Sequence, residues 1–126
     1  MRLIDTSAWI EFLLGTALGN SVRQQLPKPA EWVVPTIVQF ELSKWLVREL
    51  GKDEADSAIA ASQRLVVAPL VTAIAIDAAD LNRQYKLPTA DAIVYATARA
   101  YDAELLTCDS HFEGLPGVSY LPKRSN

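Results

Sequence analysis

The chain has 126 residues and a mass of 13.8 kDa, a size that favours one domain around a single core. Half of the residues are hydrophobic and 21% are charged, which excludes disordered, collagen-like and disulfide-rich proteins. The net charge is −3 and the Lys and Arg residues are scattered, so no basic stripe indicates nucleic-acid binding. A polyanionic ligand would need another source of positive charge, such as a divalent cation.

The sequence carries no sign of membrane insertion or export. The longest stretch without a charge runs from Leu65 to Ile76, shorter than the roughly 18 to 20 apolar residues of a membrane span. Asp5 interrupts the N-terminus before the apolar region of a signal peptide can form, and the lone Cys108 cannot make an internal disulfide. We therefore expect a cytoplasmic protein.

Strands and helices alternate in the first half of the chain. The apolar run Arg2-Leu3-Ile4 ends at the capping cluster Asp5-Thr6-Ser7, which is typical of a buried strand followed by a helix. Proline at position 27 and glycine at position 51 each end a predicted helix. The predicted strands are 2–4 and 32–34, and the predicted helices are 8–14, 17–26 and 36–50.

The same alternation continues to the C-terminus. We predict helices over 53–63, 71–86 and 90–101, strands over 65–68, 104–107 and 118–121, and a polar tail over about 122–126. The helix over 90–101 is nearly uncharged and should be largely buried. This order predicts one α/β domain over 1–126, a three-layer sandwich with a mostly parallel central sheet. Its ligand site should lie at the carboxyl ends of the strands.

Two acids, Asp5 and Asp109, lie just past the ends of predicted strands. A parallel sheet would place both carboxylates on the same rim of the fold. The alternative is that each one only caps a turn or a helix, because Asp is among the preferred capping residues.

Glu41 has apolar neighbours in its predicted helix. Ile37, Val38 and Trp45 lie on the same stripe. A buried carboxylate must be paired, protonated or bound to a metal, because an unpaired buried charge costs several kcal/mol. Lys44, three residues on, is the alternative partner.

Asp91 lies in the first turn of the helix over 90–101, where the helix dipole alone could explain an acid. However, this helix should be mostly inside the protein. Four carboxylates that converge there would repel one another and raise one another's pKa. A bound Mg²⁺ or Mn²⁺ removes that conflict, whereas one His and one Cys make a zinc site improbable.

These acids lie in motifs that resemble those of a known family. The segments Leu3–Trp9, Leu87–Ala92 and Leu106–Phe112, together with Glu41 in the helix after Pro35, resemble the successive acidic motifs of the PIN domain. They are similar in particular to VapC-type toxins of prokaryotic toxin–antitoxin pairs, and the resemblance extends from Leu3 to Leu121.

The resemblance implies a Mg²⁺- or Mn²⁺-dependent ribonuclease with an antitoxin protein as its partner. Its acidic pocket would consist of Asp5, Glu41, Asp91 and Asp109, with Ser7 and Thr107 as polar supports. Asp5, Asp91 and Asp109 would hold one or two ions, and Glu41 would bind a second ion or position the attacking water. RNA rather than DNA is favoured by the resemblance alone.

Other interpretations remain open at this stage. The acids could hold a structural ion in a non-catalytic docking module. A phosphatase with an aspartyl nucleophile normally has a DxD motif, and Asp5-Thr6-Ser7 lacks the second acid; a receiver domain needs paired acids and a strand-end lysine that are absent. His111 is either a leaving-group acid or a surface histidine, and Cys108 is best interpreted as a packing residue.

Further residues indicate partners. Trp9, Phe12 and Leu13 make the helix over 8–14 apolar on more than one side, and the mean hydropathy is +0.10. We expect a homodimer and an amphipathic antitoxin segment that lies in an apolar groove, although core burial explains about half of this pattern. The cations expected to grip RNA are Lys44, Arg48, Arg83 and Lys86.

Overall fold

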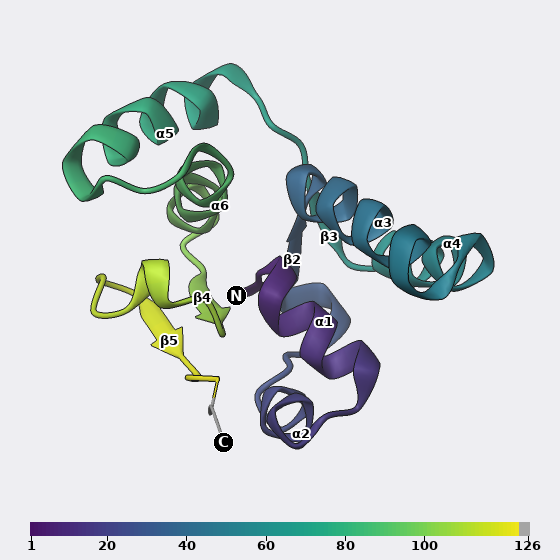
Figure 1. Ribbon diagram of the computed structural model, residues 1–126. Coiled ribbons are helices and arrows are strands. Elements are labelled where there is room, and N and C mark those ends of the chain that lie inside the picture. The colour runs from purple at the N-terminus through teal and green to yellow at the C-terminus, as the bar shows by residue number, and fades with distance from the viewer. Residues whose placement is uncertain (124–126) are drawn as a thin grey trace.

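The computed structural model describes residues 1–123 and contains a five-stranded sheet with helices on both faces (Figure 1). All neighbouring strands are parallel, and their order is β3-β2-β1-β4-β5. The strands are β1 (Arg2–Ile4), β2 (Trp32–Pro35), β3 (Val66–Ala68), β4 (Glu104–Thr107) and β5 (Val118–Tyr120). The predicted α/β sandwich with a parallel sheet is confirmed.

The helices form the two outer layers. Helices α1 to α4 lie on one side of the sheet, and α5 and α6 pack against each other on the opposite side (Figure 1). Their bounds are α1 (Thr6–Leu14), α2 (Ala17–Arg23), α3 (Thr36–Leu50), α4 (Lys52–Ser62), α5 (Thr72–Tyr85) and α6 (Thr89–Ala100), with short 3-10 turns at η1 (Pro29–Glu31) and η2 (Ser110–Phe112). Among residues 1–123, no helix has the length and apolar character needed to cross a membrane.

The core lies along the central strands. Leu3 of β1 pairs with Val33 of β2 on one side and with Leu105 of β4 on the other, and all three side chains are fully buried. Consecutive residues are apolar here, rather than alternate ones, because helices cover both faces of the parallel sheet.

The order of the strands determines where a site can form. The chain passes from β1 to β2 on one side, whereas β4 lies against the other side of β1. Loops that follow the carboxyl ends of β1 and β4 therefore diverge and leave a crevice between them. Because Ile4 pairs with Leu106, Asp5 and the segment Thr107–Asp109 lie side by side at this crevice.

Two predicted helix boundaries were wrong, and each has a local cause. The first helix begins at Thr6 instead of at residue 8, because Asp5 caps it by accepting a hydrogen bond from the Ala8 amide. The second ends at Arg23 instead of at residue 26. Leu26 precedes Pro27, and a residue before proline is disfavoured in helical conformation. The other predicted elements agree with the structure to within one residue.

Helix α6 is buried over most of its length, as its few charged residues predict. Ala92 and the run from Val94 to Ala98 are all buried. The preceding helix α5 ends because Lys86 adopts a left-handed conformation with φ 55°. Of the predicted polar tail, residues 124–126 lie outside the described part of the chain.

Candidate active site

Asp5 is the most deeply buried of the acids and is held by three hydrogen bonds. The residue is only 5% exposed to solvent. Oδ1 accepts from the Ser7 hydroxyl at 2.7 Å and from the Ala8 amide at 3.1 Å, and Oδ2 accepts from the Thr107 hydroxyl at 2.7 Å. Burial raises the pKa of Asp5 to about 6, although these hydrogen bonds favour the ionised form and limit the rise.

Ser7 and Thr107 connect the ends of β1 and β4 as well as orienting Asp5. Their hydroxyl oxygens are 3.3 Å apart. The Cys108 amide donates to the Ser7 hydroxyl at 3.0 Å, and the Asp109 amide donates to the Thr107 hydroxyl at 2.9 Å. One hydroxyl pair therefore fixes the position of Asp109 relative to Asp5.

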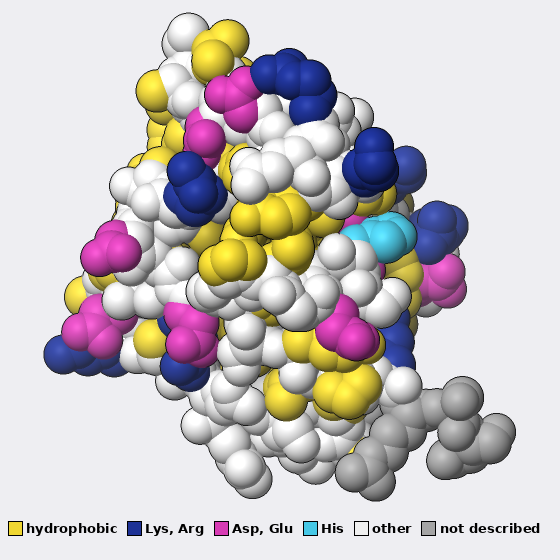
Figure 2. Space-filling view, turned by 90° about the vertical axis from the view of Figure 1, so that its left-hand side faces the viewer, with side chains coloured by type: hydrophobic (Ala, Val, Ile, Leu, Met, Phe, Trp, Pro, Cys, Tyr) yellow, Lys and Arg dark blue, Asp and Glu magenta, His cyan; other side chains and the backbone are white. Residues whose placement is uncertain are grey.

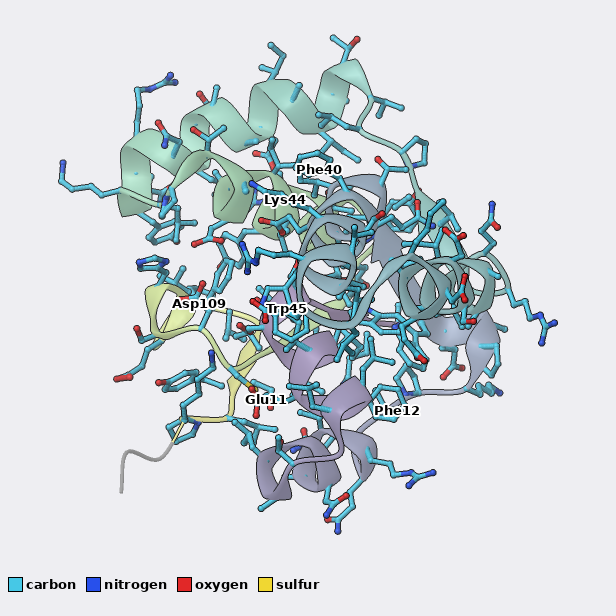
Figure 3. The ribbon with its side chains drawn as sticks, turned by 45° about the vertical axis from the view of Figure 1, so that its right-hand side comes forward. Glu11, Phe12, Phe40, Lys44, Trp45 and Asp109 are labelled. Carbon is cyan, nitrogen blue, oxygen red and sulfur yellow. The ribbon has the colours of Figure 1, made fainter. Side chains whose placement is uncertain are left out.

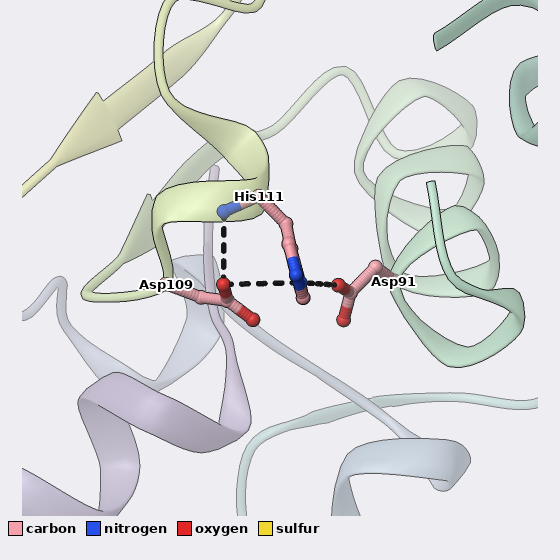
Figure 4. A group of neighbouring side chains, drawn as sticks. All are labelled: Asp91, Asp109 and His111. Carbon is pink, nitrogen blue, oxygen red and sulfur yellow. Dashed lines mark hydrogen bonds and ion pairs between the residues drawn. The ribbon is translucent and has the colours of Figure 1, made fainter. Parts of the chain in front are cut away.

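Asp91 and Asp109 come together at His111 (Figure 4). The His111 ring nitrogen Nδ1 is 2.8 Å from Oδ2 of Asp91 and 3.2 Å from Oδ1 of Asp109. Asp109 also caps the η2 turn by accepting from the His111 amide at 2.9 Å. Asp109 therefore both caps a turn and belongs to the acidic cluster, and Asp5 likewise both caps a helix and belongs to the cluster.

The proximity of these groups shifts their ionisation. Burial and the neighbouring Asp109 carboxylate raise the pKa of Asp91. The hydrogen bond to Asp91 and the charge of Asp109 raise the pKa of His111, which is exposed to solvent. Burial is thus the main cause of the shift at Asp91, and the neighbouring acids are the main cause of the shift at His111.

Glu41 lies on α3 and faces the same region from the opposite side. Its Oε1 accepts from the Thr6 hydroxyl at 2.6 Å, a contact between residues 35 positions apart. The alternative pairing with Lys44 is wrong, because within residues 1–123 no ion pair joins these two side chains. Thr6 is thus a site residue that the sequence did not reveal.

One hollow of about 230 Å³ brings the acids together. Its lining residues are Asp5, Thr6, Ser7, Ile10, Glu41, Asp91, Val94, Asp109 and Lys123. All four acids expected from the sequence therefore face one space, and Ser7 lines it as well. Thr107 lies behind Asp5, where it is fully buried. Lys123, from the predicted tail, contributes an unexpected positive charge at the edge.

A second hollow of about 250 Å³ adjoins the first along α3. Thr6 and Glu41 line both hollows, and Phe40, Lys44, Trp45 and Arg48 complete the second one. Of the four cations expected to grip a substrate, Lys44 and Arg48 thus lie beside the acids. Arg83 and Lys86 line neither hollow, and Arg83 instead pairs with Asp80.

The donor set fits a hard divalent cation. Carboxylate oxygens of Asp91 and Asp109 and the Nδ1 atom of His111 all lie within 4.8 Å of one another. The distances of 2.8 and 3.2 Å at Nδ1 are a hydrogen bond and an ion pair of His111 with the two carboxylates, so Asp91 and Asp109 supply the oxygen ligands that a hard cation prefers. Burial raises the pKa of Cys108 to about 12, and this buried thiol does not line the acidic hollow.

Comparison with known proteins places this geometry in a wider group. A family model described as the PIN domain matches residues 2–118. A toxin–antitoxin complex from Klebsiella pneumoniae has a TM-score of 0.82 at 24% identity, with coverage of 94% of this chain and 96% of that one. VapC20 of Mycobacterium tuberculosis, described as a sarcin–ricin loop cleaving toxin, has a TM-score of 0.76 at 19% identity, with coverage of 99% and 100%.

A third structure, VapBC2 from Rickettsia felis bound to a DNA fragment from the promoter of its genes, has a TM-score of 0.75 at 15% identity, with coverage of 98% of both chains. No curated protein sequence matches the chain. The shared fold therefore extends over nearly the whole length of this chain, while the sequences have diverged widely.

Proposed function

This chain belongs to the PIN-domain family, and from that premise we propose that it is a metal-dependent endoribonuclease, the toxin of a toxin–antitoxin pair. The observation that carries the proposal is the convergence of Asp5, Glu41, Asp91 and Asp109 on one hollow. Four carboxylates in so small a space repel one another unless a cation is bound between them.

The residues divide into those that would hold the ion and those that orient them. Asp5, Asp91 and Asp109 would hold Mg²⁺ or Mn²⁺, and the Ser7 and Thr107 hydroxyls fix the orientation of Asp5. When bound, the ion supplies positive charge that favours ionisation of the attacking water and offsets the charge developing on the phosphoryl oxygens.

We assign to Glu41 the role of accepting a proton from the attacking water. Thr6 donates to Oε1 of Glu41 and so fixes the carboxylate, while Oε2 is left to accept a proton from the attacking water. Water is the nucleophile, so no side chain needs to attack the phosphorus. The Ser7 hydroxyl has a different role, because it donates a hydrogen bond to Asp5. The bond between phosphorus and the 3′ oxygen breaks as the water attacks, and the departing oxygen takes up a proton from solvent, so the expected products are a 5′-phosphate and a 3′-hydroxyl.

RNA is the proposed substrate. The acids alone do not discriminate, because hydrolysis of a phosphodiester is the same chemistry in RNA and in DNA. Support comes from the similar fold of VapC20, which is described as cleaving the sarcin–ricin loop. The partner we propose is an antitoxin protein, supported by the toxin–antitoxin complexes of similar fold.

A homodimer is part of the same proposal. The apolar character of the first helix, which led us to expect partners, is explained in part by the core, because Trp9 is buried against Trp32. A different surface supports the dimer better. Figure 2 shows hydrophobic side chains exposed among charged and polar ones on the side of the molecule that α5 lies on. Between α5 and α6, Ala75, Ala79 and Ile93 line an apolar hollow of about 220 Å³, and Ile76 of α5 is 63% exposed.

The experiment that tests the function compares RNA and DNA oligonucleotides of one sequence with Mn²⁺, Mg²⁺ or EDTA. We expect cleavage of RNA only with metal, loss of cleavage in Asp91→Asn, and full activity in the matched control Asp53→Asn, whose residue is exposed on α4. Cleavage that persists in EDTA or in Asp91→Asn would contradict the proposed site. Equal cleavage of DNA would overturn the choice of RNA.

A further inference from the structure

The second hollow, beside the acidic one, combines positive charge with aromatic rings. Phe40, Lys44 and Arg48 follow one another at four-residue intervals on α3 and are all exposed, Phe40 to 60%. Trp45 is partly buried and lines the hollow beside Lys44. Figure 3 shows Lys44 and Trp45 leaving α3 on the side of Asp109.

We propose that this hollow binds the stretch of single-stranded RNA next to the bond that is cut, with Lys44 and Arg48 on phosphates and the rings of Trp45 and Phe40 against bases. The inference rests on the proposed function, and it names the residues that hold the RNA substrate next to the acidic site. Cations interleaved with aromatic rings are the composition of grooves that bind single strands, because every base has a face that can stack.

Continuity with the acidic hollow identifies the occupant. Thr6 and Glu41 line both spaces, so a strand whose phosphate lies among the acids continues into the second hollow. Four carboxylates repel the phosphates that flank the reacting one, and a net charge of −3 gives no general attraction. Positive charge is therefore needed at this boundary.

Lys44 is free to supply that charge. Within residues 1–123 it makes no ion pair, and Arg48 pairs only with its exposed neighbour Glu49, at 3.1 Å. An exposed pair of adjacent residues contributes little and is easily exchanged for a phosphate. An apolar protein segment would fit the rings but would leave both cations unused, which is why RNA is the favoured occupant.

The tryptophans provide a direct probe. The chain has three, and Trp9 and Trp32 are buried at 3% and 9% exposure, so Trp45 is the one that bound bases can reach. Titration with a short single-stranded RNA of mixed sequence in EDTA should quench tryptophan fluorescence without cleavage. Trp45→Phe should abolish the quenching but keep the affinity, measured by anisotropy of labelled RNA, because a ring that can stack remains.

Two further variants measure the contributions of the ring and of the charges. Trp45→Ala should weaken RNA binding by about five-fold or more. The double variant Lys44→Gln, Arg48→Gln should weaken binding and reduce the slope of log affinity against log salt by about 1.4, the value for two phosphate contacts on a single strand. The control Lys28→Gln, Arg64→Gln removes the same charge from exposed positions outside both hollows and should change neither quantity.

Cleavage assays separate this inference from the proposed function. With Mn²⁺, the variants of α3 should raise KM and leave kcat nearly unchanged. If the wild type cleaves RNA but Trp45→Ala and the double variant bind RNA as tightly as it does, the inference is wrong and the proposed function stands. If RNA binding depends on these residues but no RNA is cleaved, the hollow binds RNA and the proposed ribonuclease function is wrong. If only the binding of a protein partner is weakened by Trp45→Ala, the hollow belongs to that partner and the inference is wrong.

Discussion

Thr107 donates a hydrogen bond of 2.7 Å to Asp5, although 102 positions separate the two residues in the sequence. The Thr107 hydroxyl also accepts from the Asp109 amide at 2.9 Å. A single side chain at the end of β4 thus sets the orientation of one acid and the position of another. Both contacts are buried or partly buried, so the loss of one hydrogen-bond partner would lower the stability of the fold.

Thr107→Val tests this double role. The valine has a similar shape but leaves Oδ2 of Asp5 and the Asp109 amide without partners, so the free energy of unfolding should fall by about 1 to 3 kcal/mol. Urea unfolding measures the change, and Thr107→Ser should recover most of it. Equal stability of Thr107→Val and wild type would show that the hydroxyl has no such role.

The buried Asp5 should make the metal-free protein less stable as pH rises. Its pKa is raised from 3.8 to about 6 by burial, so the folded protein holds the proton more tightly than the unfolded chain does. The stability that comes from this proton is fully present below pH 3.8 and is lost as pH rises through 6.

Asp5→Asn should therefore raise the free energy of unfolding in EDTA at pH 8 by up to about 3 kcal/mol, and should leave it nearly unchanged at pH 4. The amide still accepts from Ser7 and Ala8 through its oxygen, and its nitrogen can donate to Thr107. Chemical unfolding at the two pH values measures the difference. A variant that is less stable than wild type at pH 8 would contradict the assigned cost of ionising Asp5.

His111→Ala should have an effect of opposite sign at low pH. The neighbouring acids raise the pKa of His111, so the charged ring stabilises the fold below pH 6.5 and this contribution is lost as pH rises through its folded pKa. The side chain is 57% exposed, which limits the loss at pH 6 to about 1 kcal/mol or less. Thermal unfolding in EDTA at pH 6 and pH 9 tests this, with no difference expected at pH 9.

Glu41→Gln should separate the chemical step from metal binding. If Glu41 accepts the proton of the attacking water, kcat for RNA cleavage should fall by about 100-fold or more, while the affinity for Mn²⁺ changes little. Thr6→Val should cause a smaller loss, because the carboxylate remains but is no longer held by a hydrogen bond. A loss of Mn²⁺ binding in Glu41→Gln would instead make Glu41 a ligand.

Ala79→Glu tests the proposed dimer. Ala79 lines the apolar hollow between α5 and α6, and a buried charge without a partner there would strongly disfavour association. We expect wild type to sediment as a dimer and Ala79→Glu as a folded monomer. A wild-type monomer would remove the dimer from the proposal.

Much of this fold follows from local pattern. Short apolar runs that end at Asp5 and at Asp109 predict parallel strands with acids on one rim, since a strand delivers the next residue to a fixed edge of the sheet. The scarcity of charged residues in α6 likewise predicts that Asp91 lies on a largely buried helix.

Contacts between residues far apart in the sequence could not be predicted from the hydrophobic pattern. The hydrogen bond from Thr6 to Glu41 depends on how α1 packs against α3, which no periodicity records. Lys123 reaches the acidic hollow from a segment without regular structure. The burial of Trp9 was equally hidden, because an apolar helix face looks the same in sequence whether a core or a partner covers it.

The most direct test of the four-carboxylate site is the binding of Mn²⁺ itself, followed by electron paramagnetic resonance of the free ion during titration of the protein. Wild type and the control Asp53→Asn should bind Mn²⁺ with the same stoichiometry, and Asp109→Asn should lose at least ten-fold in affinity. Unchanged binding in Asp109→Asn, or no binding by the folded wild type, would contradict the metal site on which the proposed ribonuclease depends.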